Sequence, residues 1–294
     1  MNGAIVVNKA QGWTSHDVVN KIRKIGQIKK VGHLGTLDPG ATGVLPLVIG
    51  RATRLAQFYA ASDKVYDAVV HFGWATDSYD AEGEVAGEKR EPAELDEGRL
   101  APLLDRFRGT FEQTPPPISA KKIHGVPAYK LARRAQPVDL KPVEITVHSL
   151  ELLSRQGPRA RLKVHCSAGT YLRSLAHDLG RMYGCGGFLE SLVRLRSAEF
   201  TLEQARTMEQ LIGLAAAGRL SEAVIPAARL LPDMPSQTVD RLTETQIRQG
   251  RDFRGSPFRA AAALERVKAM SVSGDLVAIG EARLPNVYHP VVVL

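Results

Sequence analysis

Residues 32–47 read GHLGTLDPGATGVLPL and combine glycine, proline and threonine with a single carboxylate, Asp38. The Asp-Pro-Gly step at 38–40 is common in turns, so Asp38 has an ordinary structural explanation. The glycines, however, leave backbone that another molecule can approach closely. A phosphate-binding P-loop is excluded, because the lysine of that motif falls on Ala41. The residues alone leave two interpretations of Asp38 open, a turn residue or a reacting group.

The elements before this stretch are a strand and an amphipathic helix. Residues 4–9 (AIVVNK) predict a short strand, and residues 14–26 predict a helix with Ser15 as N-cap and Gly26 as its end. The polar side of the helix and the loop after it are basic, with Lys21, Arg23, Lys24, Lys29 and Lys30. Such a face is either simply solvated or a contact for an anion.

Two further segments predict a strand and a strand followed by a helix. Residues 64–74 are rich in β-branched and aromatic side chains and predict a largely buried strand. Residues 159–167 alternate apolar and polar side chains, which is typical of a half-exposed strand. A helix follows, with Thr170 as its candidate cap and Gly184 as its end. Strands alternating with helices indicate an α/β or α+β domain.

Residues 77–84 (DSYDAEGE) resemble a calcium-binding loop only in composition. The acids stand at the first, fourth, sixth and eighth positions, which does not match the ligand spacing of such a loop, so a polar hairpin turn is expected. The eight histidines form no HExxH or similar motif, and the two cysteines, Cys166 and Cys185, form no CxxC pair. No metal site and no disulfide are expected.

Length and charge favour two domains and a polyanionic partner. The chain has 294 residues and a net charge of +8, with a pI of about 9.6. Residues 111–142 are rich in proline and basic side chains, and two prolines near residue 233 precede about sixty residues with strand-like runs. No signal peptide or membrane span is predicted.

Several motifs in the same order resemble the TruB family of pseudouridine synthases. Besides residues 32–47, they are KAQGWTSHDVV, KVYDAVVHFGWATDSYDAEGE, PPPISAKKIHGVPAYKLAR, SAGTYLRSLAHDLG and CGGFLESLVRLR. The resemblance implies an α+β catalytic domain at 1–232, built on a mixed, mainly antiparallel sheet with flanking helices and carrying an RNA-contacting insertion at about 111–142. It also implies a small β-rich PUA-like RNA-binding domain at 236–294.

The resemblance further implies an isomerase that converts uridine to pseudouridine in the T-loop of tRNA, at position 55. Members of this family use no cofactor and no metal. The expected partner is the T-arm of tRNA, with no protein partner and no membrane, and the expected state is a cytoplasmic monomer.

The resemblance assigns roles to six residues. Asp38 matches the nucleophile, and its attack on the base or on the ribose carbon is left open. Arg173 matches its cationic partner in an enclosed pocket. Tyr66 is expected to stack on the flipped uracil and is a candidate acceptor for the C5 proton. Tyr171 and Leu192 are expected to line the same pocket, and His33 to fill the space that the base leaves. Taken alone, Tyr66, Tyr171, Leu192 and His33 each have an ordinary packing explanation.

The sequence leaves two alternatives open. One is an RNA-guided relative of the same superfamily, which the stand-alone type of insertion at 111–142 argues against. The other is a catalytically inactive RNA-binding or tRNA-folding protein, which the presence of Asp38, Tyr66 and Arg173 argues against.

Overall fold

The computed structural model describes residues 1–117, 122–123, 126–127, 140–255 and 265–294. Of the basic side chains expected in the 111–142 segment, Lys121, Lys130, Arg133 and Arg134 lie outside the described residues. Within the described residues, no helix is long and apolar enough to cross a membrane.

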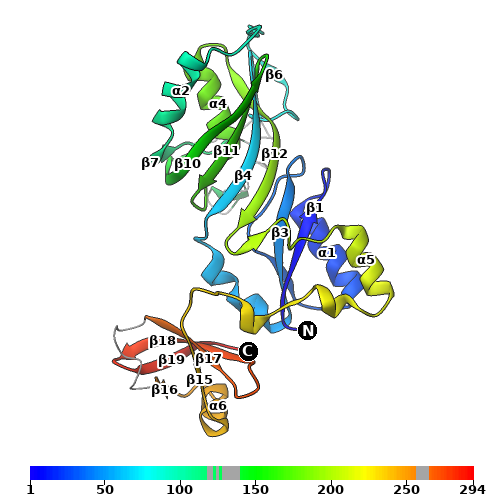
Figure 1. Cartoon of the computed structure of the whole chain (residues 1–294), viewed down its shortest axis with the longest axis vertical. Helices are drawn as coiled ribbons and strands as arrows, with labels where there is room; N and C mark the ends of the chain where they lie inside the picture. Colours follow the sequence, from blue (N-terminus) through cyan, green and yellow to red (C-terminus); the bar gives the residue numbers. More distant parts are fainter. Residues whose placement is uncertain (118–121, 124–125, 128–139, 256–264) are drawn as a thin grey trace.

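A ten-stranded sheet forms the larger part of the molecule (Figure 1). Its main path runs β14-β1-β3-β12-β4-β11-β10-β7, with β2 added to β3 and β13 added to β12. The strands are β1 (Gly3–Lys9), β2 (Val31–His33), β3 (Thr42–Ile49), β4 (Lys64–Phe72), β7 (Gly109–Gln113), β10 (Val143–Gln156), β11 (Arg159–Cys166), β12 (Gly187–Ser197), β13 (Phe200–Thr201) and β14 (Ile225–Pro226). Ladders within this sheet are antiparallel except β3–β12, so the predicted mixed, mainly antiparallel sheet is confirmed.

Helices flank the sheet in two groups (Figure 1). Helices α2 (Glu97–Arg106) and α4 (Leu172–Tyr183) lie along the β10–β11–β4 half, and α1 (Ser15–Gly26) and α5 (Met208–Ala216) along the β1–β3 half. Short elements complete this part: η1 (Gly50–Tyr59), η2 (Leu220–Ala223), η3 (Ala227–Arg229), the hairpin β5 (Ala75–Thr76) with β6 (Val85–Ala86), and the hairpin β8 (Lys122–Ile123) with β9 (Val126–Pro127).

The parallel β3–β12 contact joins the two halves of the sheet. It pairs Val193 with Thr42 and Arg194 with Gly43. Gly43 has a φ of +98°, and a Cβ there would lie 2.3 Å from the Arg194 carbonyl oxygen, so only glycine permits this approach. The loop that carries Asp38 leads directly into β3 and therefore lies at this junction.

A second sheet contains the end of the chain. Its order is β15-β17-β18-β19-β16, and one helix, α6, packs on it. The elements are β15 (Ser236–Thr238), α6 (Arg241–Arg248), β16 (Phe253–Arg254), β17 (Arg266–Met270), β18 (Leu276–Leu284) and β19 (Val287–Val293). Leu276, Ile279 and Val292 share an apolar cluster with Val6 and Val48 of the large sheet, so the two sheets are packed together.

Two predicted helix starts were wrong by one residue each. Thr14, not Ser15, is the N-cap of α1, and it forms a capping box with Asp17. Tyr171, not Thr170, is the N-cap of α4, although Gly184 ends that helix as predicted. At α1 the Ser15 hydroxyl is not free to cap the helix, because it is hydrogen-bonded to the backbone of Leu37.

Candidate active site

The loop that carries Asp38 is fixed by hydrogen bonds to its backbone. The buried Ser15 hydroxyl donates to the Leu37 carbonyl (3.0 Å) and accepts from the Leu37 N–H (2.8 Å). The Ala41 N–H donates to the Asp38 carbonyl (3.1 Å), which closes a tight turn around Pro39. Asp38 is therefore a turn residue as well as a candidate reacting group.

Arg194 lies beneath this loop and is only 1 % exposed. Its guanidinium donates to three backbone carbonyls, those of Val44 (2.7 Å), Gly35 (3.0 Å) and Thr36 (3.3 Å). A buried charge needs such hydrogen bonds, because nothing else replaces the water that it has lost. The same bonds tie the loop before Asp38 to strand β12.

Lys9 holds the other side of the loop. Its buried ammonium donates to the carbonyls of Trp13 (2.7 Å), Ala10 (3.1 Å) and Pro39 (3.2 Å). Burial lowers the pKa of Lys9 to about 8, and the charge of Asp38 opposes this shift. Lys9 therefore holds the Pro39 carbonyl on one side of Asp38, and Arg194 holds the carbonyls of Gly35 and Thr36 on the other.

Arg173, in the first turn of α4, faces the Asp38 carboxylate directly. Its Nη2 lies 3.0 Å from Asp38 Oδ2, and its Nη1 lies 3.4 Å from Asp80 Oδ2 and 3.3 Å from the Ser78 carbonyl oxygen. The Arg173 side chain is 9 % exposed, whereas that of Asp38 is 50 % exposed. The expectation of an enclosed pocket was wrong for the Asp38 carboxylate, because this group is half exposed and only its partner Arg173 is buried.

Asp38 and Arg173 line a cleft of about 690 Å³. Its size is within the range of ligand sites. Its walls come from five places in the chain: the start of α1, the Asp38 loop, the β5–β6 turn, the start of α4 and the bulged part of β12. The residues with side chains that bear on function are His16, His33, Asp38, Asp77, Asp80, Glu82, Glu84, Arg173, Glu190 and Leu192.

The structure brings four of the six predicted site residues to this cleft: Asp38, Arg173, His33 and Leu192. Burial lowers the pKa of His33, with smaller contributions from Arg194 and His16, so its imidazole is neutral at neutral pH. Leu192, on β12, also packs partly against the core.

The two predicted tyrosines are not among the residues that line the cleft. Tyr66 lies in β4, paired with Arg194 of β12 and Val164 of β11, and its side chain belongs to the main apolar cluster. Burial raises the pKa of its phenol, a shift that the charge of Arg194 opposes. Tyr171 precedes Arg173 at the start of α4, where its backbone exchanges two hydrogen bonds with the Gln113 side chain (2.8 and 3.1 Å).

Sequence reasoning missed three residues of this site. Arg194 and Lys9 carry no motif of their own, although a lysine or arginine inside an apolar strand is a signal worth testing. Asp80 was assigned to a polar hairpin turn. The turn exists, but it docks on β12 through the Ala81 N–H and the Leu189 carbonyl (3.1 Å), which brings Asp80 to Arg173.

Comparison with known proteins identifies the chain's relatives. Residues 23–172 match the N-terminal domain of TruB family pseudouridylate synthase, and residues 173–232 match the tRNA pseudouridylate synthase B C-terminal domain. A tRNA pseudouridine synthase B from Solibacter usitatus (strain Ellin6076) is 58 % identical over 294 residues, which covers 100 % of both chains. One from Symbiobacterium thermophilum is 46 % identical over 253 residues, covering 85 % of this chain and 82 % of the relative.

Solved structures extend the similarity. A chain in the crystal structure of a Cbf5-Nop10-Gar1 complex has a TM-score of 0.72 at 26 % identity, covering 97 % of this chain and 79 % of that one. A chain in an H/ACA RNP bound to a substrate RNA containing 2′-deoxyuridine has a TM-score of 0.73 at 25 % identity, covering 99 % and 84 %. On the fold, the family match and the full-length relative together, this chain belongs to the TruB family of pseudouridylate synthases.

Proposed function

We propose that this protein is an isomerase that converts a uridine of tRNA into pseudouridine, and that this uridine is the one at position 55 in the T-loop. The observation that carries the proposal is the Asp38 carboxylate, which lies in an open cleft 3.0 Å from the Arg173 guanidinium. Support for tRNA as the substrate comes from the full-length relative, which is a tRNA pseudouridine synthase B.

In this reaction the bond from ribose C1′ to N1 of uracil breaks and a bond from C1′ to C5 forms. C5 loses a proton and N1 gains one, so substrate and product are isomers. A nucleophile that holds the reacting fragment covalently prevents loss of the base. We assign this role to Asp38, acting on the base or on C1′, and assign to Arg173 the orientation of Asp38 Oδ2.

The remaining assignments concern the flipped base. Tyr66 does not line the cleft in the structure, and we assign it to stacking on the uracil once the base has entered, worth about 1 to 3 kcal/mol. Its raised pKa keeps the phenol neutral, which favours stacking over removal of the C5 proton. Leu192 and Tyr171 complete the base pocket. His33, whose Nδ1 has no hydrogen-bond partner among the described residues, takes the place of the base in the T-loop.

We also propose that residues 1–232 form the catalytic domain, with the insertion at about 111–142, and that residues 236–294 form a PUA-like RNA-binding domain. The second sheet has its own apolar cluster, which includes Val239, Phe253 and Tyr288. With a net charge of +8, binding to tRNA should weaken steeply with salt. The protein would act as a cytoplasmic monomer.

One test is tritium release from tRNA labelled at C5 of uridine, with purified protein and no other component. We expect label to be released, and the Asp38→Asn variant to release none. Asp67→Asn is the matched control, since Asp67 pairs with Arg161 away from the cleft. A tRNA with cytidine at position 55 should release nothing. Normal release by Asp38→Asn would remove Asp38 from its role, and release from the cytidine tRNA would remove the assigned position.

The same assay separates the two other candidates. The RNA-guided alternative draws support from the similarity to a chain in a Cbf5-Nop10-Gar1 complex. It requires that the purified chain alone be inactive and become active with a guide RNA and accessory proteins. An inactive RNA-binding protein would bind tRNA and release no label under either condition.

A further inference from the structure

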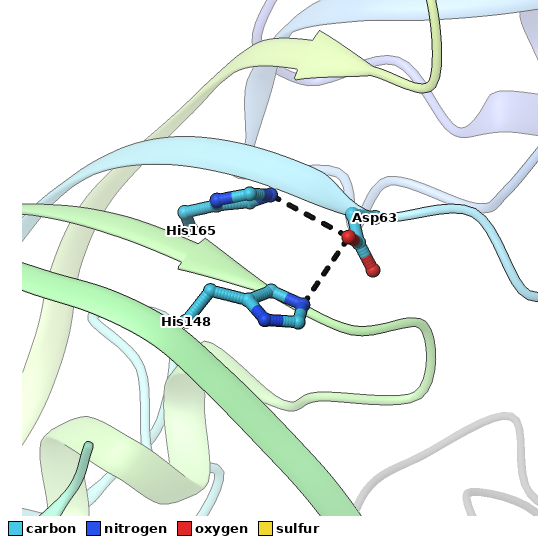
Figure 2. A group of neighbouring side chains, drawn as sticks. All are labelled: Asp63, His148 and His165. Atoms are coloured by element: carbon cyan, nitrogen blue, oxygen red, sulfur yellow. Dashed lines mark ion pairs between the residues drawn. The ribbon is translucent and has the colours of Figure 1, made fainter. Parts of the chain in front are cut away.

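Three side chains outside the cleft converge at one end of the large sheet: Asp63, His148 and His165 (Figure 2). Asp63 immediately precedes β4, His148 lies in β10, and His165 lies near the end of β11. Asp63 Oδ2 is 3.2 Å from His148 Nε2 and 3.6 Å from His165 Nε2. The three residues are far apart in sequence, so no linear motif predicts that they lie together.

A β-bulge places His148 beside His165. Val147 pairs with Cys166 and Ser149 pairs with His165, which leaves His148 as the extra residue of β10. Bulges re-aim side chains and are over-represented next to functional sites. Asp63 is fixed as well, because its carbonyl accepts a hydrogen bond from the Ala198 N–H (3.0 Å). All three side chains therefore project from anchored backbone.

The two separations from Asp63 are those of ligands around one metal ion, and the ligand atoms of all three residues lie within 4.8 Å of one another. Zn²⁺ binds imidazole nitrogen and carboxylate oxygen at about 2.0 to 2.2 Å, so two ligands of a tetrahedron lie about 3.3 Å apart. The distances from Asp63 to the two histidines bracket this value. Elsewhere in the chain His289 Nδ1 lies 2.7 Å from Asp252 Oδ1, an ordinary hydrogen-bond length for such a pair.

We propose that Asp63, His148 and His165 form a binding site for a borderline divalent transition-metal ion such as Zn²⁺, with the remaining coordination position open to water. Two imidazoles and one carboxylate suit zinc and its neighbours, whereas Mg²⁺ and Ca²⁺ prefer oxygen ligands throughout. The three side chains are between 30 and 42 % exposed, so an ion can enter and leave without unfolding of the sheet.

The groups around His165 have opposing effects on its pKa and on the binding of a cation. Burial, and then the charges of His148 and Arg196, lower the pKa of His165, whereas Asp63 raises it. Arg196 also competes, since its Nη2 lies 3.4 Å from His165 Nε2, the atom that would bind the ion. Its exposed side chain must turn aside and its charge repels a cation.

The test is equilibrium dialysis of untagged full-length protein against Zn²⁺ at pH 7.5, with Co²⁺ absorption as a probe of coordination. We expect one ion per chain, unaffected by excess Mg²⁺. His148→Gln and Asp63→Asn should each lower the association constant at least about tenfold. Arg196→Gln should raise it about fivefold, because it removes a nearby positive charge.

Two controls make the outcome decisive. His289→Gln removes a histidine that pairs with a carboxylate but has no third ligand among the described residues, and it should leave binding unchanged. The melting temperature of each variant without metal reports whether it folds. If a ligand variant does not fold, Arg196→Gln still tests the proposal. Absence of stoichiometric binding to the wild type overturns the proposal. Binding that persists in His148→Gln and Asp63→Asn, or that does not strengthen in Arg196→Gln, also overturns it.

Discussion

The part of the sheet formed by β4, β11 and β12 has Arg194 of β12 on one face and Arg161 of β11 on the other, and these two arginines are used differently. On the face of Tyr66, Arg194 is 1 % exposed and donates to three backbone carbonyls. On the opposite face, the Arg161 side chain is 55 % exposed and forms a bidentate pair with Asp67, with hydrogen bonds of 2.9 and 2.6 Å. The same functional group is structural support on one face and a solvated surface pair on the other.

The contrast shows how this fold fixes a reactive loop. A buried guanidinium that donates to carbonyls cannot leave without exposing or orphaning each of them, so it holds the backbone in one conformation. An exposed ion pair is screened by water and loses little when it breaks. If the difference in burial is also a difference in energy, changes at Arg194, Lys9, Arg173 and Arg161 should have effects of decreasing size.

The largest expected effect is that of Arg194→Met. The variant leaves the carbonyls of Val44, Gly35 and Thr36 without their donor in a buried site. We expect the free energy of unfolding to fall by about 3 to 5 kcal/mol, measured by urea denaturation. Arg161→Met is the matched control on the other face. A loss below about 1 kcal/mol would mean that burial of Arg194 does not carry the energy assigned to it.

Lys9 is expected to have the next largest effect, and it depends on pH. Its pKa of about 8 in the folded protein is below the 10.5 of an unperturbed lysine, so the unfolded state binds more protons between these values. Stability should therefore rise with pH in this window. The destabilising cost of the buried charge is fully present below pH 8 and is relieved above it.

We expect the stability of the wild type, relative to Lys9→Met, to rise by about 2 kcal/mol between pH 7 and 9.5. Urea denaturation of both proteins across this range measures the difference, which cancels the titration of other groups. A difference that stays flat with pH would show that Lys9 does not titrate in this window.

Arg173→Gln should lower the free energy of unfolding less than Arg194→Met does. It should lower turnover more than any change on the sheet face that carries Arg161. Asp38 is 50 % exposed and can be solvated when its partner is lost, so the expected cost is about 1 to 2 kcal/mol. Turnover should fall at least about a hundredfold, because Asp38 Oδ2 loses the contact that orients it. Urea denaturation and tritium release measure the two quantities. A loss of stability with turnover unchanged would mean that Arg173 only supports the fold.

The sequence was sufficient for the parts of this site that obey regular patterns. Strict alternation in residues 159–166 correctly predicted which side of β11 is buried, and the glycine-rich motif drew attention to Asp38. The burial of Arg194 could not be predicted from the sequence, because Leu195 is the extra residue of a β-bulge. Arg194 is paired with Tyr66 and Arg196 with Val65. Two arginines two residues apart normally share a face, but the bulge buries one and exposes the other.

The remainder depended on contacts between distant segments. The parallel pairing of Gly43 with Arg194 joins residues about 150 positions apart, and no local propensity encodes it. The histidines at 148 and 165 belong to no linear motif for the same reason, since a second bulge and the approach of Asp63 bring them together. Sequence patterns specify elements, and tertiary contacts decide which side chains meet.

The smallest expected effect is that of Arg161→Ala, which completes the comparison between the two faces. The pair with Asp67 has good bidentate geometry, yet more than half of the arginine side chain is in water. We expect tritium release to change by less than about twofold and the urea midpoint to stay within experimental error. Arg161 is also close to the strand that carries Tyr66, so a marked loss of turnover without loss of stability would place it on the path of the RNA. In that event the open face of the sheet would be part of the substrate interface, and the two arginines would differ in partner and not in importance.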